Sequence, residues 1–167
     1  MPIVTAKHAG FCMGVRRAVD EAMKASRQYG KIATIGELVH NPQVIRRLET
    51  QGIHAVDTPA EAAGKTAVIR SHGVEPGVYA DLETLHCRTL DLTCPFVKHL
   101  HETVARYSQD GKPVIIAGRR DHPEVSGTIG WCHGTVYTVS NVQQAESLVA
   151  GGQVGGHGGG HVRVDPF

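Results

Sequence analysis

Residues 66–95 read TAVIRSHGVEPGVYADLETLHCRTLDLTCP, and the order of apolar and polar residues in this stretch predicts the fold class. The apolar run over 66–70 has the length of a buried strand, and Pro76 then opens a helical pattern. A second strand is predicted over 88–92. Two strands that flank a helix need a crossover connection, so the stretch predicts parallel pairing and an α/β fold.

The same alternation continues on both sides of this stretch. Further strands are predicted over 2–6, 31–35, 53–56, 113–117 and 135–139. Helices are predicted over 14–29, from Pro42 to Gln51-Gly52, briefly after Thr58, from Pro76 to about 86, from Pro95 through Tyr107, and from Asn141 to about 150. We expect a first α/β lobe over 1–94, an incomplete second lobe over 95–150, and a disordered Gly-rich tail over 151–167.

The composition favours a soluble globular protein that binds small molecules or proteins. A hydrophobic content of 41% is enough for a core, and a net charge of +1 predicts no broad attraction to nucleic acid or membrane. No run approaches the roughly 18 apolar residues of a membrane span, and the N-terminus lacks a signal-peptide h-region, so a cytoplasmic location is expected. Four widely spaced cysteines in such a chain make disulfides the weaker interpretation.

Unusual residues gather directly after predicted strands. The five loops concerned contain residues 8–12, His40, residues 71–73, residues 93–95 and residues 121–124. Ligands of parallel α/β proteins bind at the carboxyl ends of the strands. We therefore expect the five loops to converge on one site.

Two of the four cysteines are candidate metal ligands. Cys12 lies between two glycines and Cys94 precedes a proline, which places both at tight turns before helices, where the helix dipole favours a thiolate or an anion. Thiolate and imidazole ligands suit both zinc and iron–sulfur clusters, and the spacing is not that of a zinc finger. Cys87 and Cys132 are interpreted as packing residues.

Histidine and glutamate supply the remaining candidates. His40, His72 and His122 follow three different strands, which together is stronger evidence for a ligand site than any one of them. Glu124 either caps the turn after His122 or acts as an acid. Other residues are given no native role: His99 and His101 face different ways on one helix, Arg16 and Arg17 form a solvated face, and His157 and His161 lie in the Gly-rich tail.

Five segments resemble those of one enzyme family, the 4-hydroxy-3-methylbut-2-enyl diphosphate reductases of the methylerythritol phosphate route to isoprenoids. The segments are GFCMGVRRAV at Cys12, GELVHNPQV at His40, RSHGV at His72, DLTCPFVKHLH at Cys94 and GRRDHPEVSGTIG at His122. They occur in the family's order, and the similarity covers roughly residues 2–150. The resemblance implies three similar α/β lobes, in a trefoil-like arrangement, around a central cluster, with the first lobe and most of the second present here.

The resemblance also implies a chemistry. A 4Fe-4S cluster would be held by three cysteines, two of them Cys12 and Cys94, while His40, His72 and His122 would bind the allylic diphosphate substrate. Glu124 would deliver a proton as the hydroxyl leaves as water, giving isopentenyl and dimethylallyl diphosphate. Electrons would come from a donor such as ferredoxin or flavodoxin.

The chain departs from the family pattern after about residue 150. The family's third cluster cysteine, its threonine-bearing SQTT-like segment and its Ser-x-Asn diphosphate motif all lie further along than this sequence reaches. We therefore expect a C-terminally truncated form with little or no activity. Two alternatives stay open: a non-catalytic zinc module that uses Cys12, Cys94 and nearby histidines, and a metal-free phosphate-binding α/β domain.

Overall fold

The computed structural model of the chain describes residues 3–4, 6–7 and 9–150. Its strands are β1 (Ile32–Ile35), β2 (Ile53–Val56), β3 (Thr66–Ile69), β4 (Arg88–Asp91), β5 (Val114–Ala117) and β6 (Val136–Val139). Its helices are α1 (Met13–Tyr29), α2 (Pro42–Glu49), α3 (Pro76–Thr84), α4 (Pro95–Ser108), α5 (Pro123–Gly130) and α6 (Val142–Ala150), with a 3-10 helix η1 (Pro59–Ala62).

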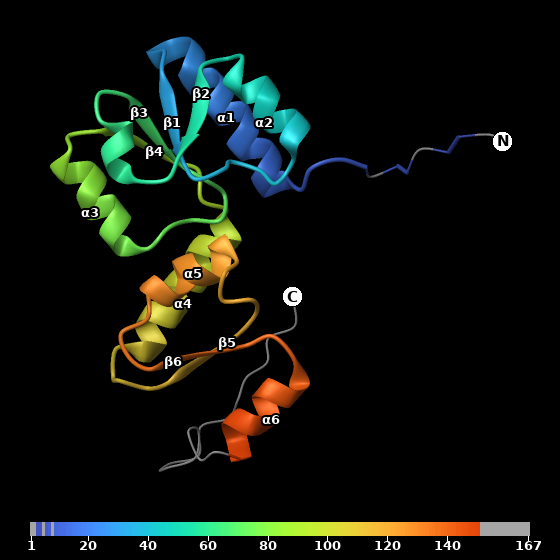
Figure 1. Cartoon of the computed structure of the whole chain (residues 1–167), viewed down its shortest axis with the longest axis vertical. Coiled ribbons are helices and arrows are strands. Elements are labelled where there is room, and N and C mark those ends of the chain that lie inside the picture. The colour runs from blue at the N-terminus through green and yellow to red at the C-terminus, as the bar shows by residue number, and fades with distance from the viewer. Residues whose placement is uncertain (1–2, 5, 8, 151–167) are drawn as a thin grey trace.

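The strands form two separate parallel sheets. The first sheet has the order β2-β1-β3-β4, and the second pairs β5 with β6. Figure 1 shows the first sheet at one end of the molecule, the second towards the other end, and α4 and α5 between them. The α/β class with parallel sheets, predicted from the sequence, is confirmed.

The two central strands of the first sheet, β1 and β3, are buried along their whole length, whereas no residue of the edge strand β4 is buried. Along β1 the side chains alternate: Ile32 packs with α1 and α2 in one apolar cluster, while Ala33 and Ile35 pack with η1 and α3 in the other. In β3, likewise, Val68 packs in the first cluster, while Ala67 and Ile69 pack in the second. Covered on two sides, these strands read as continuous apolar runs, which is why the sequence revealed them.

The predicted caps explain where several helices begin. The Asn41 side chain accepts hydrogen bonds from the N–H groups of Gln43 and Val44, and Asn141 accepts one from Gln144. In both helices a side-chain oxygen thus satisfies a backbone donor that the first turn leaves free. The helix α3 ends two residues short of the prediction, because His86 adopts a left-handed conformation (φ 51°).

The second sheet is less well covered. No residue of β5 or β6 is buried, and α6 has no buried residue either. A hollow of about 600 Å³ lies along β6 and α6, lined by residues that include Tyr137, Asn141 and Leu148. In the described part of the chain this sheet has two strands, with α4 against β5 and α6 against β6, and a two-stranded sheet of this size packs loosely.

The N-terminal prediction was wrong where the structure describes it. Ile3, Val4 and Ala6 are not in a strand, and the side chains of Ile3 and Val4 are 96% and 87% exposed. An apolar run becomes a strand only beside a partner, and no strand in the described part of the chain pairs with it. The remaining residues of that run lie outside the described ranges.

The remaining predictions concern the region after His122, the Gly-rich tail and the lobe boundary. The helix α5 begins directly after His122, and no bounds were predicted for it. The disorder predicted for 151–167 concerns residues outside the described ranges, and the lobe boundary near Cys94 stays a prediction. In the part of the chain that the structure describes, no helix is long and apolar enough to cross a membrane.

Candidate functional site

Three loops bring His40, His72 and His122 together, and these residues are called the histidine triad below. His40 lies between β1 and α2, His72 between β3 and α3, and His122 directly before α5. Their ring centroids are 4.8 Å (His40 to His72), 5.9 Å (His40 to His122) and 5.8 Å (His72 to His122) apart. The predicted convergence of these three loops is therefore seen in the structure.

The environment of His72 favours a neutral imidazole. Burial is the largest of the causes that lower the pKa of His72 to about 4, and the nearby His40, Arg70 and His122 contribute to the same shift. The Nδ1 atom of His122 accepts the N–H of Glu124 at 3.3 Å, so the ring proton of neutral His122 lies on Nε2. At neutral pH His72 is thus an uncharged N–H donor, and so is His122 in its neutral form.

A buried histidine supports the loop that carries His72. His101 of α4 is only 3% exposed, and its ring stacks on Trp131 at a centroid distance of 5.3 Å. It also packs against Gly73, whose φ of 71° favours glycine. Trp131 in turn donates its indole N–H to the carbonyl of Val74 at 2.9 Å. The two rings therefore hold the segment that follows His72.

No role was predicted for His101 from the sequence, because His99 and His101 are two residues apart on one helix and so were not expected to bind a metal ion together. A signal was present nonetheless: Val97, His101, Val104 and Ser108 recur at helical spacing, and all four are buried. Burial lowers the pKa of His101, which disfavours the charged form of the ring that supports Gly73. The expectation that His99 and His101 point in different directions is confirmed, since His99 is exposed.

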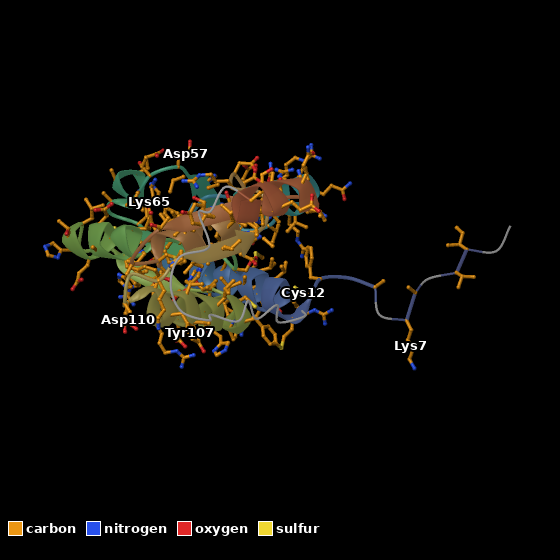
Figure 2. All side chains as sticks on the ribbon, turned by 90° about the horizontal axis from the view of Figure 1, so that it is seen from below. Lys7, Cys12, Asp57, Lys65, Tyr107 and Asp110 are labelled. Atoms are coloured by element: carbon orange, nitrogen blue, oxygen red, sulfur yellow. The ribbon has the colours of Figure 1, made fainter. Side chains whose placement is uncertain are left out.

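The two predicted ligand cysteines begin two helices. Cys12 is the N-cap residue of α1 and is exposed, and Cys94 is the N-cap residue of α4 and is half-buried. Figure 2 shows Cys12 where the N-terminal segment leaves the body of the molecule, with Lys7 further out. The thiol of Cys94 lies 2.9 Å from the position that a Cβ on Gly14 would occupy. Any side chain at residue 14 would therefore collide with the Cys94 thiol.

The Cys94 loop is held by several hydrogen bonds. The N–H of Cys94 donates to the carbonyl of Ser71 at 3.0 Å, which joins this loop to the His72 loop. Arg17 donates to the carbonyl of Thr93 at 3.3 Å, so this arginine is more than the solvated face expected from the sequence. The carboxylate of Asp91 accepts the N–H of Thr93 at 2.9 Å and lies 2.7 Å from the Lys98 amine.

The charge on Asp91 is kept by this network. Burial acts to raise the pKa of Asp91, but the hydrogen bonds from Lys98 and Thr93 outweigh burial, and the pKa lies below its ordinary value. A charged Asp91 fixes the backbone directly before Cys94. The Cys94 side of the candidate site is thus built by the end of β4 and the start of α4.

The remaining candidates occupy the positions that their sequence context suggested. Glu124 is the second residue of α5 and is half-buried beside His122. Cys87 packs against the apolar cluster around α3, and its thiol donates to the Ala62 carbonyl. The thiol of Cys132 donates to the Thr128 carbonyl, and burial raises its pKa. Both contacts agree with the packing interpretation of these two cysteines.

The described residues do not complete a metal site. No three side chains among His, Cys, Asp and Glu lie close enough in the described ranges to hold a metal ion. The zinc-module alternative therefore lacks a ligand set in this part of the chain. Cys12 and Cys94 each begin a helix, and their role as thiolate ligands stays a prediction.

Comparison with known proteins decides the family. The family model described as LytB protein matches residues 3–155. The chain belongs to the LytB family. The resemblance found in the sequence is thus confirmed, while the roles of the individual cysteines and histidines stay predictions.

Two curated LytB relatives illustrate the similarity. The 4-hydroxy-3-methylbut-2-enyl diphosphate reductase of Caldanaerobacter subterraneus is 39% identical over 153 residues, covering 89% of this chain and 53% of the relative. The enzyme of the same name from Geobacter sulfurreducens is 40% identical over 148 residues, covering 89% and 52%. The chain spans about half the length of the curated relatives it matches.

Solved LytB-type structures agree with the fold. The E-1-hydroxy-2-methyl-but-2-enyl-4-diphosphate reductase of Plasmodium falciparum superposes with a TM-score of 0.79 at 25% identity, over 85% of this chain and 45% of that one. A structure titled as (E)-4-hydroxy-3-methyl-but-2-enyl diphosphate reductase, the terminal enzyme of the non-mevalonate pathway, gives a TM-score of 0.73 at 37% identity. That second match covers 88% of this chain and 54% of the solved one.

Proposed function

We propose that this chain forms the diphosphate-binding face, and part of the cluster-binding face, of a 4-hydroxy-3-methylbut-2-enyl diphosphate reductase. The observation that carries the proposal is the meeting of three histidines from three separate loops, beside a loop bonded to that of Cys94. The names of the LytB relatives supply the substrate and the reaction.

The histidine triad suits a diphosphate group. A diphosphate presents several acceptor oxygens in a small volume, and three ring N–H groups from different directions can donate to them together. The half-buried setting of His72 and His122 excludes part of the competing water, and this strengthens each hydrogen bond. His40 is exposed and would close over the ligand from the β1–α2 loop.

Cys12 and Cys94 would supply two of the three thiolates that the family resemblance implies for a 4Fe-4S cluster. They lie at the starts of α1 and α4, where a helix N-terminus attracts negative charge. The third thiolate would come from protein beyond the described residues. When bound, the cluster would supply electrons and a Lewis-acidic iron.

The proposed reaction replaces a carbon–hydroxyl bond by a carbon–hydrogen bond. The C–O bond breaks, two electrons and two protons are consumed, and one water leaves together with the allylic or homoallylic diphosphate. We assign Glu124 as the proton donor, since its carboxyl group begins α5 directly after the triad residue His122. Ferredoxin or flavodoxin as the electron donor, and a cytoplasmic location, belong to the same proposal.

The test compares the chain alone with the chain extended by the part of a LytB relative that it does not span. Both are reconstituted anaerobically with iron and sulfide, examined by visible and EPR spectroscopy, and assayed with an artificial electron donor. We expect a weak cluster and little turnover for the chain alone, and a stable cluster with turnover for the extended chain. Robust turnover by the chain alone would contradict the need for a third thiolate.

Serine variants test whether Cys12 and Cys94 hold the cluster. Cys12→Ser and Cys94→Ser in the extended chain are expected to remove the cluster signal, while Cys87→Ser, which changes a packing residue, keeps it. A chain that binds inorganic diphosphate but never yields a cluster or turnover when extended would instead support the metal-free phosphate-binding domain.

A further inference from the structure

Arg70 lies at the end of β3, on the same turn as His72. The N–H of Gly73 donates to the carbonyl of Arg70 at 3.0 Å, which closes a turn over residues 70–73. The guanidinium of Arg70 packs against Gly36, whose φ of 71° and lack of a side chain leave room for it. The turn and this contact fix the position of the guanidinium relative to the triad.

The charge of Arg70 has no counter-charge in direct contact. Its Nε atom is buried and lacks a hydrogen-bond partner, and no carboxylate of the described residues lies within ion-pair distance of it. Glu37 acts on it only through longer-range attraction and is itself exposed. Burial lowers the pKa of Arg70, but a guanidinium stays charged in proteins.

A half-buried cation without a partner is unfavourable, because desolvation costs free energy that no ion pair offsets. A chain gains nothing in stability from such an arrangement unless an anion completes it. The charge of Arg70 is felt at the triad, where it lowers the pKa of His72 together with His40 and His122. Arg70 precedes His72 by two residues, and its guanidinium packs against Gly36, the first residue of the β1–α2 loop that carries His40.

We propose that Arg70 is a further anion-binding residue beside the histidine triad and supplies a permanent positive charge, which a neutral imidazole lacks. The inference rests on the proposed function, whose ligand is a diphosphate. A diphosphate carries two to three negative charges near neutral pH, and a guanidinium offers two parallel N–H donors that match a phosphate edge. The histidines then provide direction and Arg70 provides charge.

The test measures the binding of inorganic diphosphate to the whole chain by isothermal titration calorimetry. Arg70→Gln is expected to weaken binding about ten- to hundred-fold, the loss typical of a charge-assisted hydrogen bond. Arg70→Lys keeps the charge but not the two parallel N–H donors, and its diphosphate affinity should lie between those of the wild-type chain and Arg70→Gln. Arg88→Gln is the matched control, because Arg88 starts the edge strand β4 and stacks on Tyr29, 4.3 Å from its ring centroid.

The pH dependence separates a charge from a packing role. The charged and titratable groups that act on His72 are His40 from the β1–α2 loop, His122 directly before α5, and Arg70. Glu37 lies 4.0 Å from the Nδ1 atom of His40, and the backbone N–H of Glu124 donates to His122. Without Arg70, positive charge comes only from imidazolium, so the deficit of Arg70→Gln should grow from pH 6 to pH 8. A structural defect alone gives a deficit that does not change over this range, and that result overturns the inference.

Arg70→Lys keeps the test decisive if Arg70→Gln fails to fold, because it retains the charge and loses the two parallel donors. Glu37→Gln removes an exposed carboxylate that attracts Arg70 and lies 4.0 Å from the Nδ1 atom of His40, so it reports on the charge around the whole site. Diphosphate binding by Glu37→Gln should tighten about two-fold, as expected for a screened surface charge. If neither Arg70→Gln nor Glu37→Gln alters diphosphate binding, the inference about Arg70 is overturned and the proposed function is not. Wild-type chain that binds no diphosphate overturns the proposed function as well.

Discussion

The two sheets of the molecule show how differently one chain can bury its strands. Every residue of β1 and β3 is buried, whereas no residue of β5 or β6 is. The first sheet has four strands with helices on both faces, while the second has two strands and a hollow beside α6. The first sheet thus carries a core of its own, and the second contributes the His122 loop on much weaker support.

The largest expected difference between the sheets is in core mutants. Ile32→Ala removes a side chain that is 1% exposed and should lower the free energy of unfolding by about 2–5 kcal/mol. Ile115→Ala in β5 changes a side chain that is 37% exposed and should cost about 1 kcal/mol or less. Urea unfolding followed by circular dichroism measures both.

Equal losses from the two isoleucine variants would contradict the comparison, because they would mean that both sheets unfold from cores of similar quality. Leu48→Ala provides a further control within the first region. It is 3% exposed and packs in the same cluster as Ile32, so it should resemble Ile32→Ala rather than Ile115→Ala.

Much of the first sheet could be predicted because its strands are covered on both sides. The runs at Ile32, Ile53 and Thr66 are continuously or nearly continuously apolar, and each is bounded by a recognisable cap, glycine or proline. The run over 2–6 has the same pattern but pairs with no strand in the described part of the chain. Pairing is a long-range property that a local pattern does not contain.

The sequence predicted which histidines belong to the candidate site, but not which residues pack against the loops that carry them. The triad follows from strand-end loops, a rule that parallel topology imposes on any such sheet. The roles of His101 and Arg70 depend on what packs against Gly73 and Gly36, and those contacts come from distant segments. Sequence spacing therefore indicated which histidines come together better than it indicated which residues support them.

The helix caps give a smaller, matched comparison. Asn41→Ala removes the hydrogen bonds to Gln43 and Val44 at the start of α2, and should lower the free energy of unfolding by about 1 kcal/mol. Asn141→Ala removes the same kind of cap from α6, whose residues are not buried. It should loosen α6 and leave the unfolding of the first sheet unchanged.

Amide hydrogen exchange distinguishes these outcomes residue by residue. Faster exchange confined to α6 is expected for Asn141→Ala, and faster exchange throughout the first sheet for Asn41→Ala. If Asn141→Ala destabilised β1 and β3 as much as Asn41→Ala does, the two sheets would have to be one cooperative unit, contrary to the comparison.

The smallest expected effect is a dependence of stability on pH that arises near the first sheet. The pKa of His72 is about 4 in the folded chain, below the ordinary value of 6.5, so the unfolded chain binds more protons between these values. Stability due to neutral His72 is therefore complete above about pH 6.5 and is lost as the pH falls towards 4. Urea midpoints at pH 7 and pH 5 measure the loss.

His72→Gln should reduce this loss without abolishing it, because burial also lowers the pKa of His101. His99→Gln is the control, since His99 is exposed on α4 and its removal should leave the pH dependence as it was. An unchanged pH dependence in His72→Gln would show that His72 is not held neutral in the folded chain.

The most direct test of the account is a titration of the chain with inorganic diphosphate, followed by NMR of the histidine ring protons. The central claim is that His40, His72 and His122 form one anion-binding site. We predict that these three signals shift together and saturate at the same ligand concentration, while those of the exposed His54 and His99 stay in place. Shifts at His54 and His99 with an unmoved triad would contradict the claim.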